Sequence, residues 1–434
     1  MSLIKADTLM IAYNDAIGVV FYPEKGAIST TTPAHAKIMK TVYEKYLNNI
    51  LDDSDRTVFE DYIDRSFANK PVLPLAQYPN LLERLDLGRL EIMVANDCNL
   101  NCKYCYAHGG SYGLKVQRMN PPEAVKYLEA LLIGRYKKVG IVTFFGGEPT
   151  IVPETILAVC DFFYKHTDSG DFLAMPTFSM VTNGTLLSPS LVEIIKKYDI
   201  HVTVSVDGPK DVHDQLRVHK DGRGTFDTIE ESINMLKAAE IPPQMIEATY
   251  TALHQRLGYT KTAIRDYLQE HFGVERILIP NCTSEDEHSD LAYIGEESTL
   301  YDQLEELKIE QALSRNSLVD ISCSAGTNVF TLMPNGELYP CHFFIGHSEY
   351  CLARYHNADY NFDNYPAVLD ALMPAHKFKN SACKDCWAKS LCLACPASIL
   401  INKEPSNGNS IFCHFERLRL IKRIISLAQK ASNK

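Results

Sequence analysis

Three cysteines stand within one short stretch of the chain, at Cys98, Cys102 and Cys105. On a loop that leaves a predicted strand, this C-x3-C-x2-C spacing lets three thiolates face one point. Tetrahedral zinc would need a fourth protein ligand, for which the loop offers only His108. A four-iron cluster held by three cysteines instead leaves one iron free to bind a small molecule. The residues of the loop alone leave both metals open.

Six short segments rich in β-branched and aromatic residues predict the strands that position this loop. They lie at 90–96, 139–145, 177–183, 201–207, 245–251 and 275–281, and segments with helical spacing separate them. In 201–207 valines alternate with Thr203, Ser205 and Asp207, which favours a barrel with a polar lumen over a sheet buried on both faces. We therefore expect an α/β fold, a partial (β/α)6 TIM-like barrel with functional residues at the carboxyl ends of its strands.

The regions on either side of the barrel have different patterns. Residues 8–13, 17–22 and 27–30 predict an antiparallel meander, followed by a helix that Thr32 and Pro33 begin and a second helix near Val58. The first helix has an expected apolar side made of Ile38, Met39, Val42, Tyr46 and Leu47. From about residue 320 the chain is cysteine-rich and irregular until a last helix. The expected domains are a small winged-helix-like domain at 1–88, the barrel at 89–315 and an iron-sulfur domain at 316–434.

Composition narrows the class of protein. The chain of 434 residues has a formal net charge of -11 and no run of Lys and Arg, so nucleic acid is not an expected partner. Without an apolar run of membrane-spanning length or a signal-like start, we expect a cytoplasmic protein with no membrane partner. Thirteen cysteines in a reducing compartment indicate metal binding or catalysis rather than disulfides. The isolated Cys160 and Cys282 are expected to be buried apolar residues.

The stretch CNLNCKYCY at 98–106 resembles the cluster loop of the radical S-adenosylmethionine (radical SAM) enzymes. FGGEP at 145–149, TNG at 182–184, SVDGP at 205–209 and the stretch 213–226 agree with that resemblance. It implies a 4Fe-4S cluster on Cys98, Cys102 and Cys105, with SAM chelating its open iron. It also implies a set of SAM contacts. Tyr104 would lie beside the adenine, Ser205 would bind the ribose and Arg217 would bind the carboxylate. The SAM ammonium would lie beside Gly146 and Gly147 and pair with Glu148, and Thr182 and Asn183 would contact SAM from a strand end.

The later cysteines resemble the seven-cysteine SPASM extension of many radical SAM enzymes, which implies two auxiliary 4Fe-4S clusters and three clusters in all. By that resemblance Cys323, Cys341 and Cys395 bind the first, and the second is held by Cys383, Cys386, Cys392 and Cys413. The spacing of Cys392 and Cys395 departs from the family pattern, so these two assignments are exchangeable. The first cluster lacks a further upstream cysteine, which leaves either an open iron or Cys351 as its fourth ligand. C-x2-C-x5-C-x2-C alone would also suit zinc.

The function that these resemblances imply is peptide maturation by a 5'-deoxyadenosyl radical that takes hydrogen from a ribosomally made precursor. The N-terminal region resembles leader-peptide recognition elements, which bind an extended peptide by strand addition. CYAHGGSYG at 105–113 resembles enzymes that form thioether bridges from cysteine sulfur (the ranthipeptide or SCIFF maturases). Reduced ferredoxin or flavodoxin is the expected electron donor.

Alternative functions remain open. Anaerobic sulfatase maturases form formylglycine, but they are expected to carry an aspartate where His342 follows Cys341. Carbon-carbon or carbon-oxygen crosslinking is a further alternative, and a zinc-stabilised peptide-binding scaffold is the non-enzymatic one. No catalytic acid or base is assigned, since His342, Tyr339 and Arg354 are more often structural, and the sequence identifies neither the peptide nor the oligomeric state.

Overall fold

The structure is a computed structural model that describes residues 8–75, 83–282, 290–293, 307, 309–318, 323–401 and 411–432. The chain divides into two compact units, each made of segments that are distant in sequence. Unit 1 comprises 1–77, 301–323 and 372–434, and unit 2 comprises 78–300 and 324–371. The three consecutive domains expected from the sequence divide the chain by function and stay a prediction.

Six parallel strands in sequence order form the centre of unit 2. They are β4 (Asp86–Ala95), β5 (Lys138–Gly146), β6 (Thr177–Thr182), β7 (His201–Ser205), β8 (Met245–Glu247) and β9 (Ile277–Leu278). The sheet stays open, because β9 lies at one edge and β4 is bordered by a later strand instead of by β9. This arrangement confirms the predicted partial barrel.

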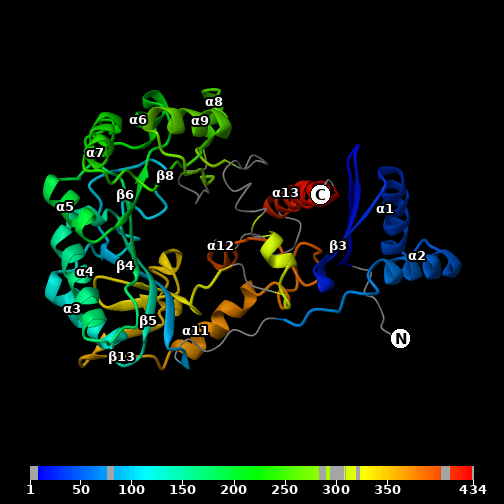
Figure 1. Cartoon of the computed structure of the whole chain (residues 1–434), viewed down its shortest axis with the longest axis horizontal. Coiled ribbons are helices and arrows are strands. Elements are labelled where there is room, and N and C mark those ends of the chain that lie inside the picture. The colour runs from blue at the N-terminus through cyan, green and yellow to red at the C-terminus, as the bar shows by residue number, and fades with distance from the viewer. Residues whose placement is uncertain are drawn as a thin grey trace. The chain divides into compact units, whose positions relative to one another are not determined.

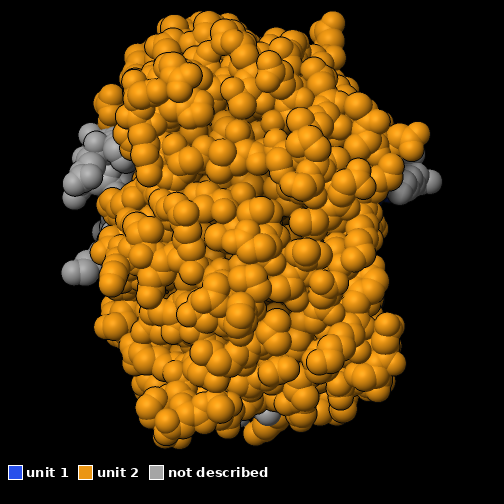
Figure 2. Space-filling view, turned by 90° about the vertical axis from the view of Figure 1, so that its left-hand side faces the viewer, with its two compact units in different colours: residues 1–77, 301–323, 372–434 blue, residues 78–300, 324–371 orange. Residues whose placement is uncertain are grey.

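Helices follow the strands and cover the outer side of the sheet (Figure 1). They are α3 (Pro121–Leu132), α4 (Pro153–Asp168), α5 (Pro189–Lys197), α6 (Lys210–Leu216), α7 (Phe226–Ala238), α8 (Ala252–Arg256) and α9 (Lys261–Phe272). Proline in the first turn starts α3, α4 and α5, and Asn120 with Glu123 forms a capping box before α3. Figure 2 shows unit 2 as a continuous surface of side chains on this side.

Residues 324–371 extend the sheet of unit 2 beyond β4. Strand β10 (Val329–Leu332) pairs parallel with β4, and β11 (Glu337–Tyr339), β12 (Ala353–His356) and β13 (Asp359–Asn361) follow it antiparallel, before α11 (Tyr365–Leu372). The expectation of an irregular region from about residue 320 is therefore wrong for this stretch. Its Asn335-Gly336 turn, with Gly336 at φ 80°, is an ordinary hairpin signal that the cysteine pattern overshadowed.

Unit 1 contains the predicted meander of β1 (Met10–Tyr13), β2 (Gly18–Tyr22) and β3 (Ala27–Thr31), then α1 (Pro33–Leu47) and α2 (Asp53–Ser66). The Thr32 side chain accepts a hydrogen bond from the His35 amide, as an N-cap does. The predicted apolar side of α1 is partly wrong, because Ile38 is 63% exposed and Leu47 49% exposed. The buried stripe instead consists of Ala36, Met39, Tyr43 and Tyr46, whose spacing of three and four residues places Ile38 on another side of the helix.

The meander is buried on both faces. One face, which includes Ile11, Val20 and Tyr22, packs against the buried residues of α1 and α2. The other face, with Met10, Val19 and Phe21, packs with the segment that follows Cys386 and with α13 (Ile411–Ser432), which Figure 1 labels beside the dark blue strands of unit 1. A short helix, α12 (Pro396–Leu400), precedes α13. The first and last segments of the chain therefore share one hydrophobic core.

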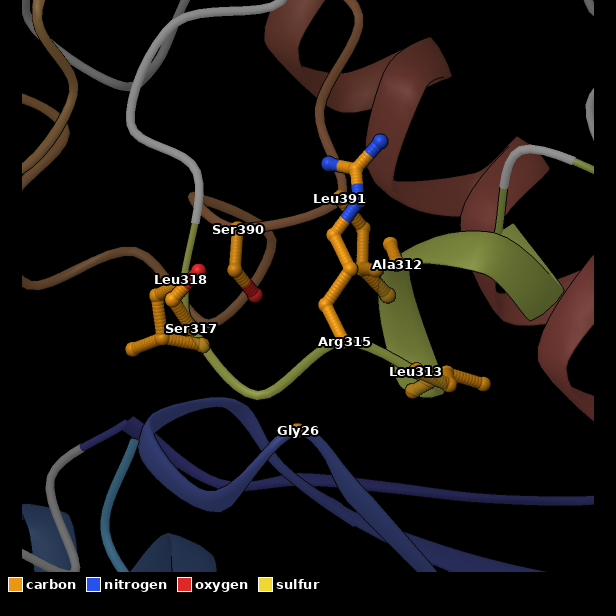
Figure 3. Close-up of a pocket in the computed structure, with 8 residues that line it drawn as sticks. All are labelled: Gly26, Ala312, Leu313, Arg315, Ser317, Leu318, Ser390 and Leu391. Atoms are coloured by element: carbon orange, nitrogen blue, oxygen red, sulfur yellow. The ribbon is translucent and has the colours of Figure 1, made fainter. Parts of the chain in front are cut away.

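A small pocket that opens to solvent lies in unit 1 (Figure 3). It is lined by Gly26, Ala312, Leu313, Arg315, Ser317, Leu318, Ser390 and Leu391. The lining has one charged side chain, Arg315, and no cysteine, so it offers neither a metal set nor an acid-base pair. None of the helices in the described ranges is long and apolar enough to cross a bilayer.

Candidate functional site

The loop with Cys98, Cys102 and Cys105 is held by hydrogen bonds at its base and along its length. At its base the Asn96 side chain accepts from the Gln117 amide at 2.6 Å and donates to the Lys115 carbonyl at 2.9 Å. Along the loop, the amides of Asn101 and Lys103 donate to the carbonyls of residues 218 and 216, at 2.8 and 3.0 Å. The thiols are therefore carried by a loop that two separate segments fix.

The three thiols are partly buried and lie close to one another. Burial raises the pKa of Cys98 to about 11 and that of Cys102 to about 12, and a charge on Cys105 would raise both further. The Cys98 sulfur accepts from the Leu100 amide at 3.4 Å and from the Asn183 side chain at 3.8 Å. In the described part of the chain, no three Cys, His, Asp or Glu side chains already converge on a metal position. Three soft donors with N–H groups aimed at sulfur nevertheless fit a thiolate-bound cluster.

Two glycines at the end of β5 allow this loop to approach the sheet. A Cβ on Gly147 would lie 2.4 Å from the Asp97 carbonyl oxygen and 2.8 Å from Gly110 Cα, and one on Gly146 would lie 2.4 Å from the Ala95 carbonyl oxygen. The sequence indicated that these glycines approach a ligand. In the structure they make room first for the backbone of the cysteine loop.

Glu148 is buried and ties the ends of β5 and β6 together. Its carboxylate accepts hydrogen bonds from the Thr150 amide and hydroxyl at 3.1 and 2.6 Å, from the Thr182 hydroxyl at 2.6 Å and from the Asn183 amide at 2.7 Å. Burial raises the pKa of Glu148, and these four bonds oppose the rise. A direct role on a ligand ammonium stays a prediction, and the carboxylate has this structural role beside it.

Arg217 and Tyr104 meet at a buried carboxylate, Asp207, which sequence reasoning did not single out. The Tyr104 hydroxyl donates to Asp207 at 2.6 Å, the Arg217 Nε lies 3.1 Å from Asp207, and the guanidinium lies 5.5 Å from the centre of the Tyr104 ring. Burial would raise the pKa of Asp207, but the Arg217 charge, the Tyr104 hydrogen bond and the neighbouring histidines together outweigh it and hold that pKa below its usual range. Arg217 Nε has no well-oriented hydrogen bond among the described residues, so the guanidinium keeps donor capacity for a carboxylate ligand.

Two buried histidines support Asp207. The Asp207 amide donates to His213 Nδ1 at 3.1 Å, so His213 carries its proton on Nε2, which donates to the Thr225 hydroxyl at 2.9 Å. His254 Nε2 lies 2.8 Å from the Asp207 carbonyl oxygen. Burial lowers the pKa of His213 to about 4, so this ring is neutral at pH 7. The signal in the sequence was Asp207 itself, a charged residue in an otherwise buried strand end.

The remaining predicted residues also lie at strand ends of unit 2. Thr182 is the last residue of β6 and Asn183 follows it, and the Asn183 side chain donates to the Asn99 side chain of the cysteine loop at 3.0 Å. Ser205, at the end of β7, is 8% exposed, and its hydroxyl has no hydrogen bond among the described residues. The structure thus brings all eight predicted SAM contacts and the three loop cysteines into one unit.

A second polar group lies within unit 2, where β4 and β10 meet. Glu91 accepts from the Thr331 hydroxyl at 2.7 Å and pairs with His342 Nδ1 at 3.0 Å. Burial disfavours its charged form, but His342 and these hydrogen bonds lower the pKa of Glu91 to about 2. The His342 ring packs against Phe145 at the end of β5, with ring centres 4.8 Å apart. Sequence reasoning missed Glu91, since it reads as one residue of an ordinary strand.

Four of the later cysteines lie near one another in unit 1. Cys383, Cys386, Cys392 and Cys413 are partly buried, and charges on Cys386 and Cys413 would each raise the pKa of Cys383. Burial raises the pKa of Cys392 to about 12, and a charge on Cys386 would raise it further. This is the set predicted for the second auxiliary cluster, and thiol donors from two turns and one helix fit it chemically.

The set predicted for the first auxiliary cluster is divided between the two units. Cys323, which is exposed, and Cys395 belong to unit 1, and Cys341 belongs to unit 2. Cys351 lies in unit 2, is 1% exposed, and directs its sulfur to the Ala353 carbonyl oxygen at 3.5 Å. This ligand set stays a prediction. Cys160 and Cys282 are 0% and 3% exposed, as expected of buried apolar residues.

Comparisons with known proteins find similarity centred on the barrel. Residues 92–257 match the Radical SAM superfamily. The radical SAM cyclopropyl synthase TigE of Paramaledivibacter caminithermalis is 32% identical over 173 residues, which cover 36% of this chain. The match covers 35% of TigE, so the chain spans about a third of that relative's length.

Two further similarities reach beyond the barrel. A cysteine-type anaerobic sulfatase-maturating enzyme of Clostridium perfringens is 23% identical over 275 residues, which cover 58% of this chain and 73% of that enzyme. The solved structure of native anSMEcpe with bound AdoMet and Cp18Cys peptide matches 80% of this chain and 99% of its own, with a TM-score of 0.61 and 18% identity. At that identity the similarity shows a shared fold.

Proposed function

Residues 92–257 form a radical SAM domain, and from this premise we propose that the whole chain is a cytoplasmic peptide maturase that forms a cysteine thioether in a ribosomally made precursor. The observation that carries the proposal is that hydrogen bonds join the cysteine loop, which follows β4, to the ends of the three neighbouring strands β5, β6 and β7 in unit 2. A radical SAM domain has SAM and a 4Fe-4S cluster as cofactors. Two auxiliary clusters, on the later cysteines, belong to the proposal.

When bound, the cluster and SAM supply a carbon radical that takes a hydrogen atom from an unactivated carbon. The protein's own residues would position these cofactors and shield them from water. Cys98, Cys102 and Cys105 would hold the cluster, and the Leu100 amide and Asn183 side chain would donate to its sulfur. Arg217, oriented by Asp207, would bind the SAM carboxylate, and Ser205 would bind the ribose. The buried packing around this network keeps water from it.

The substrate class is proposed from the N-terminal meander and from the relatives. Both faces of the meander are covered, so β1 and β3 offer edges to which an extended peptide can add as a strand. The name of the Clostridium relative states that it matures a sulfatase, and the anSMEcpe structure holds a peptide, which supports a polypeptide substrate. Reduced ferredoxin or flavodoxin would supply the electrons.

Formylglycine formation is the second candidate, favoured by the match over 73% of the Clostridium enzyme. Against it stands His342, which follows Cys341 where those maturases are expected to carry aspartate, and which pairs with Glu91. The thioether subtype rests on the 105–113 resemblance. Carbon-carbon or carbon-oxygen crosslinking would use the same radical and differs only in the product.

Anaerobic reconstitution tests the enzyme class. We expect brown protein with about twelve irons per chain and release of 5'-deoxyadenosine from SAM under dithionite. Colourless, zinc-loaded protein that leaves SAM intact would instead support the peptide-binding scaffold.

Co-expression with a short cysteine-containing peptide encoded beside the gene tests the product. A thioether removes two hydrogens and blocks one cysteine from alkylation. Formylglycine from cysteine removes the sulfur, and a carbon-carbon or carbon-oxygen crosslink leaves every cysteine open to alkylation. Either of the last two results would contradict the thioether proposal while keeping the enzyme class.

A further inference from the structure

Lys377 in unit 1 is a buried ammonium without a carboxylate partner. It is 3% exposed, and its ammonium donates to the carbonyl oxygen of Cys392, which is its one hydrogen bond among the described residues. No described Asp or Glu lies within ion-pairing distance of it. A buried charge is costly unless an opposite charge compensates it, and buried charges in proteins are therefore paired. The site therefore calls for an anion.

The surroundings of Lys377 identify where that anion would be. The hydrogen bond to the Cys392 carbonyl places the ammonium at this cysteine, and its charge also opposes the rise that burial causes in the pKa of the Cys383 and Cys392 thiols, so it lies near both residues. Glu416 also lies near Cys392, but Arg419 already compensates it at 2.6 Å. The uncompensated positive charge thus lies among the cysteines Cys383, Cys386, Cys392 and Cys413.

A four-iron cluster bound by four thiolates has a net negative charge, and reduction by one electron increases that charge by one. A fixed cation beside it therefore stabilises the reduced form more than the oxidised form. We propose that Lys377 is the counter-cation of the cluster held by Cys383, Cys386, Cys392 and Cys413, and that it raises the reduction potential of this cluster. This inference rests on the proposed function, since it needs iron and sulfide at that cysteine set.

Lys389 provides a matched control within the same unit. It is 5% exposed, and its ammonium donates to the Lys384 carbonyl at 2.7 Å, which also lies in the cysteine segment. It differs from Lys377 in having a carboxylate 3.9 Å away, on Glu24, and an aromatic ring, that of Phe378, at 5.0 Å. Its charge is compensated within the protein. Replacing it removes an equally buried lysine without removing the proposed counter-cation.

The test is a one-electron redox titration followed by electron paramagnetic resonance on the full chain. Cys98, Cys102, Cys105 and Cys341 are replaced by alanine, so that the cluster on the other cysteines gives the signal. We expect Lys377→Gln to make reduction at least tenfold less favourable, which is 59 mV for one electron. Lys377→Arg, which keeps the charge, should restore most of the potential, and Lys389→Gln should leave it unchanged.

Each outcome decides the inference. A fully iron-loaded Lys377→Gln protein with an unshifted potential overturns it, and so does an equal shift in Lys389→Gln. Loss of iron in Lys377→Gln but not in Lys377→Arg supports it, because charge is then what holds the anionic cluster. Equal loss in both variants overturns it in favour of a packing role. A parent protein without iron would overturn the proposed function first, which separates the two failures.

Discussion

The two cysteine regions of the chain are built in opposite ways. In unit 2, the cysteine loop is mounted on the carboxyl ends of parallel strands, and its polar neighbours come from β5, β6 and β7. In unit 1, the cysteine segment packs into the hydrophobic core through Trp387, Ala388 and Leu391. The first cysteine region is a loop on a sheet whose fold does not depend on the cysteines. The second cysteine region is itself part of the hydrophobic core of its unit.

This difference teaches how the same residue type serves two purposes. A strand end can present three sulfurs to a ligand because the sheet below is already stable. A segment without long regular elements depends on the metal and on its neighbours for order. We therefore expect damage to the first region to abolish chemistry with little change of fold, and damage to the second to disturb the fold of unit 1.

The largest effect should come from replacing Cys98, Cys102 and Cys105 together by alanine. Release of 5'-deoxyadenosine should fall to the level without enzyme, because the cluster proposed to bind SAM would lose all its protein ligands. Iron analysis should show a loss of about four irons per chain, with the rest retained. Cys160→Ala, at a buried cysteine outside both regions, is the control and should keep both iron and activity. Loss of all iron from the triple variant would mean that the two regions are not independent.

The next effect concerns the ion pair of Asp207 and Arg217. Asp207→Asn should lower the stability of unit 2 by about 3–5 kcal/mol, because it leaves a buried guanidinium uncompensated. Thermal unfolding followed by circular dichroism measures this change. Asp221→Asn, which breaks the exposed pair with Arg223, should have no measurable effect. Equal effects of the two variants would contradict the stabilising role of the Asp207–Arg217 pair.

Lowering the pH should reduce the free energy of unfolding of unit 2 by less than the Asp207→Asn substitution does. His213 has a pKa of about 4 in the fold and 6.5 in its ordinary state, so below pH 6.5 the unfolded chain binds a proton that the folded chain excludes. Its contribution to stability is fully present above pH 6.5 and is lost as the pH falls toward 4, by about 2 kcal/mol at pH 5. Denaturant unfolding at pH 7 and pH 5 measures it. His213→Gln, which has no proton to gain, should lose this part of the pH dependence, and an unchanged slope would contradict the assignment.

The smallest effect is spectroscopic and belongs to unit 1. Trp387 is the single tryptophan of the chain, and its ring lies edge-on to Phe21 of β2 with centres 6.4 Å apart. Replacing Cys383 and Cys413 by serine should loosen this contact and shift the fluorescence emission to longer wavelength. The triple variant of the barrel loop should leave the emission unchanged. A shift in both variants would remove the distinction between the two regions.

Sequence patterns predicted the parts of the fold that repeat. Alternating strands and helices indicated the barrel, and Thr32-Pro33 indicated the start of α1, because periodicity and caps are local signals. The burial of Ile38 was predicted wrongly, since two apolar stripes competed on one helix and only the packed fold selects between them. Strand β10 was missed because its partner, β4, lies far away in sequence.

The candidate site shows the same limit. Motifs predicted which residues gather at the strand ends, and the structure places them in one unit. They did not predict that Asp207 joins Tyr104 to Arg217, or that Glu91 pairs with His342, because these contacts link distant segments. Nothing in the sequence distinguishes Lys377 from the other lysines. Its burial without a carboxylate exists only in the folded chain.

The order in which unit 1 is assembled has a consequence for synthesis on the ribosome. Met10, Val19 and Phe21 emerge early, but the residues that cover them lie at 309–313 and, for the larger part, after position 372. Until then the nascent chain carries an apolar sheet face with no cover, which is a surface that chaperones bind and that promotes aggregation. A ribosome that stalls after residue 371 would release a product with the whole of unit 2 and an N-terminal sheet face without the cover that residues 372–434 supply.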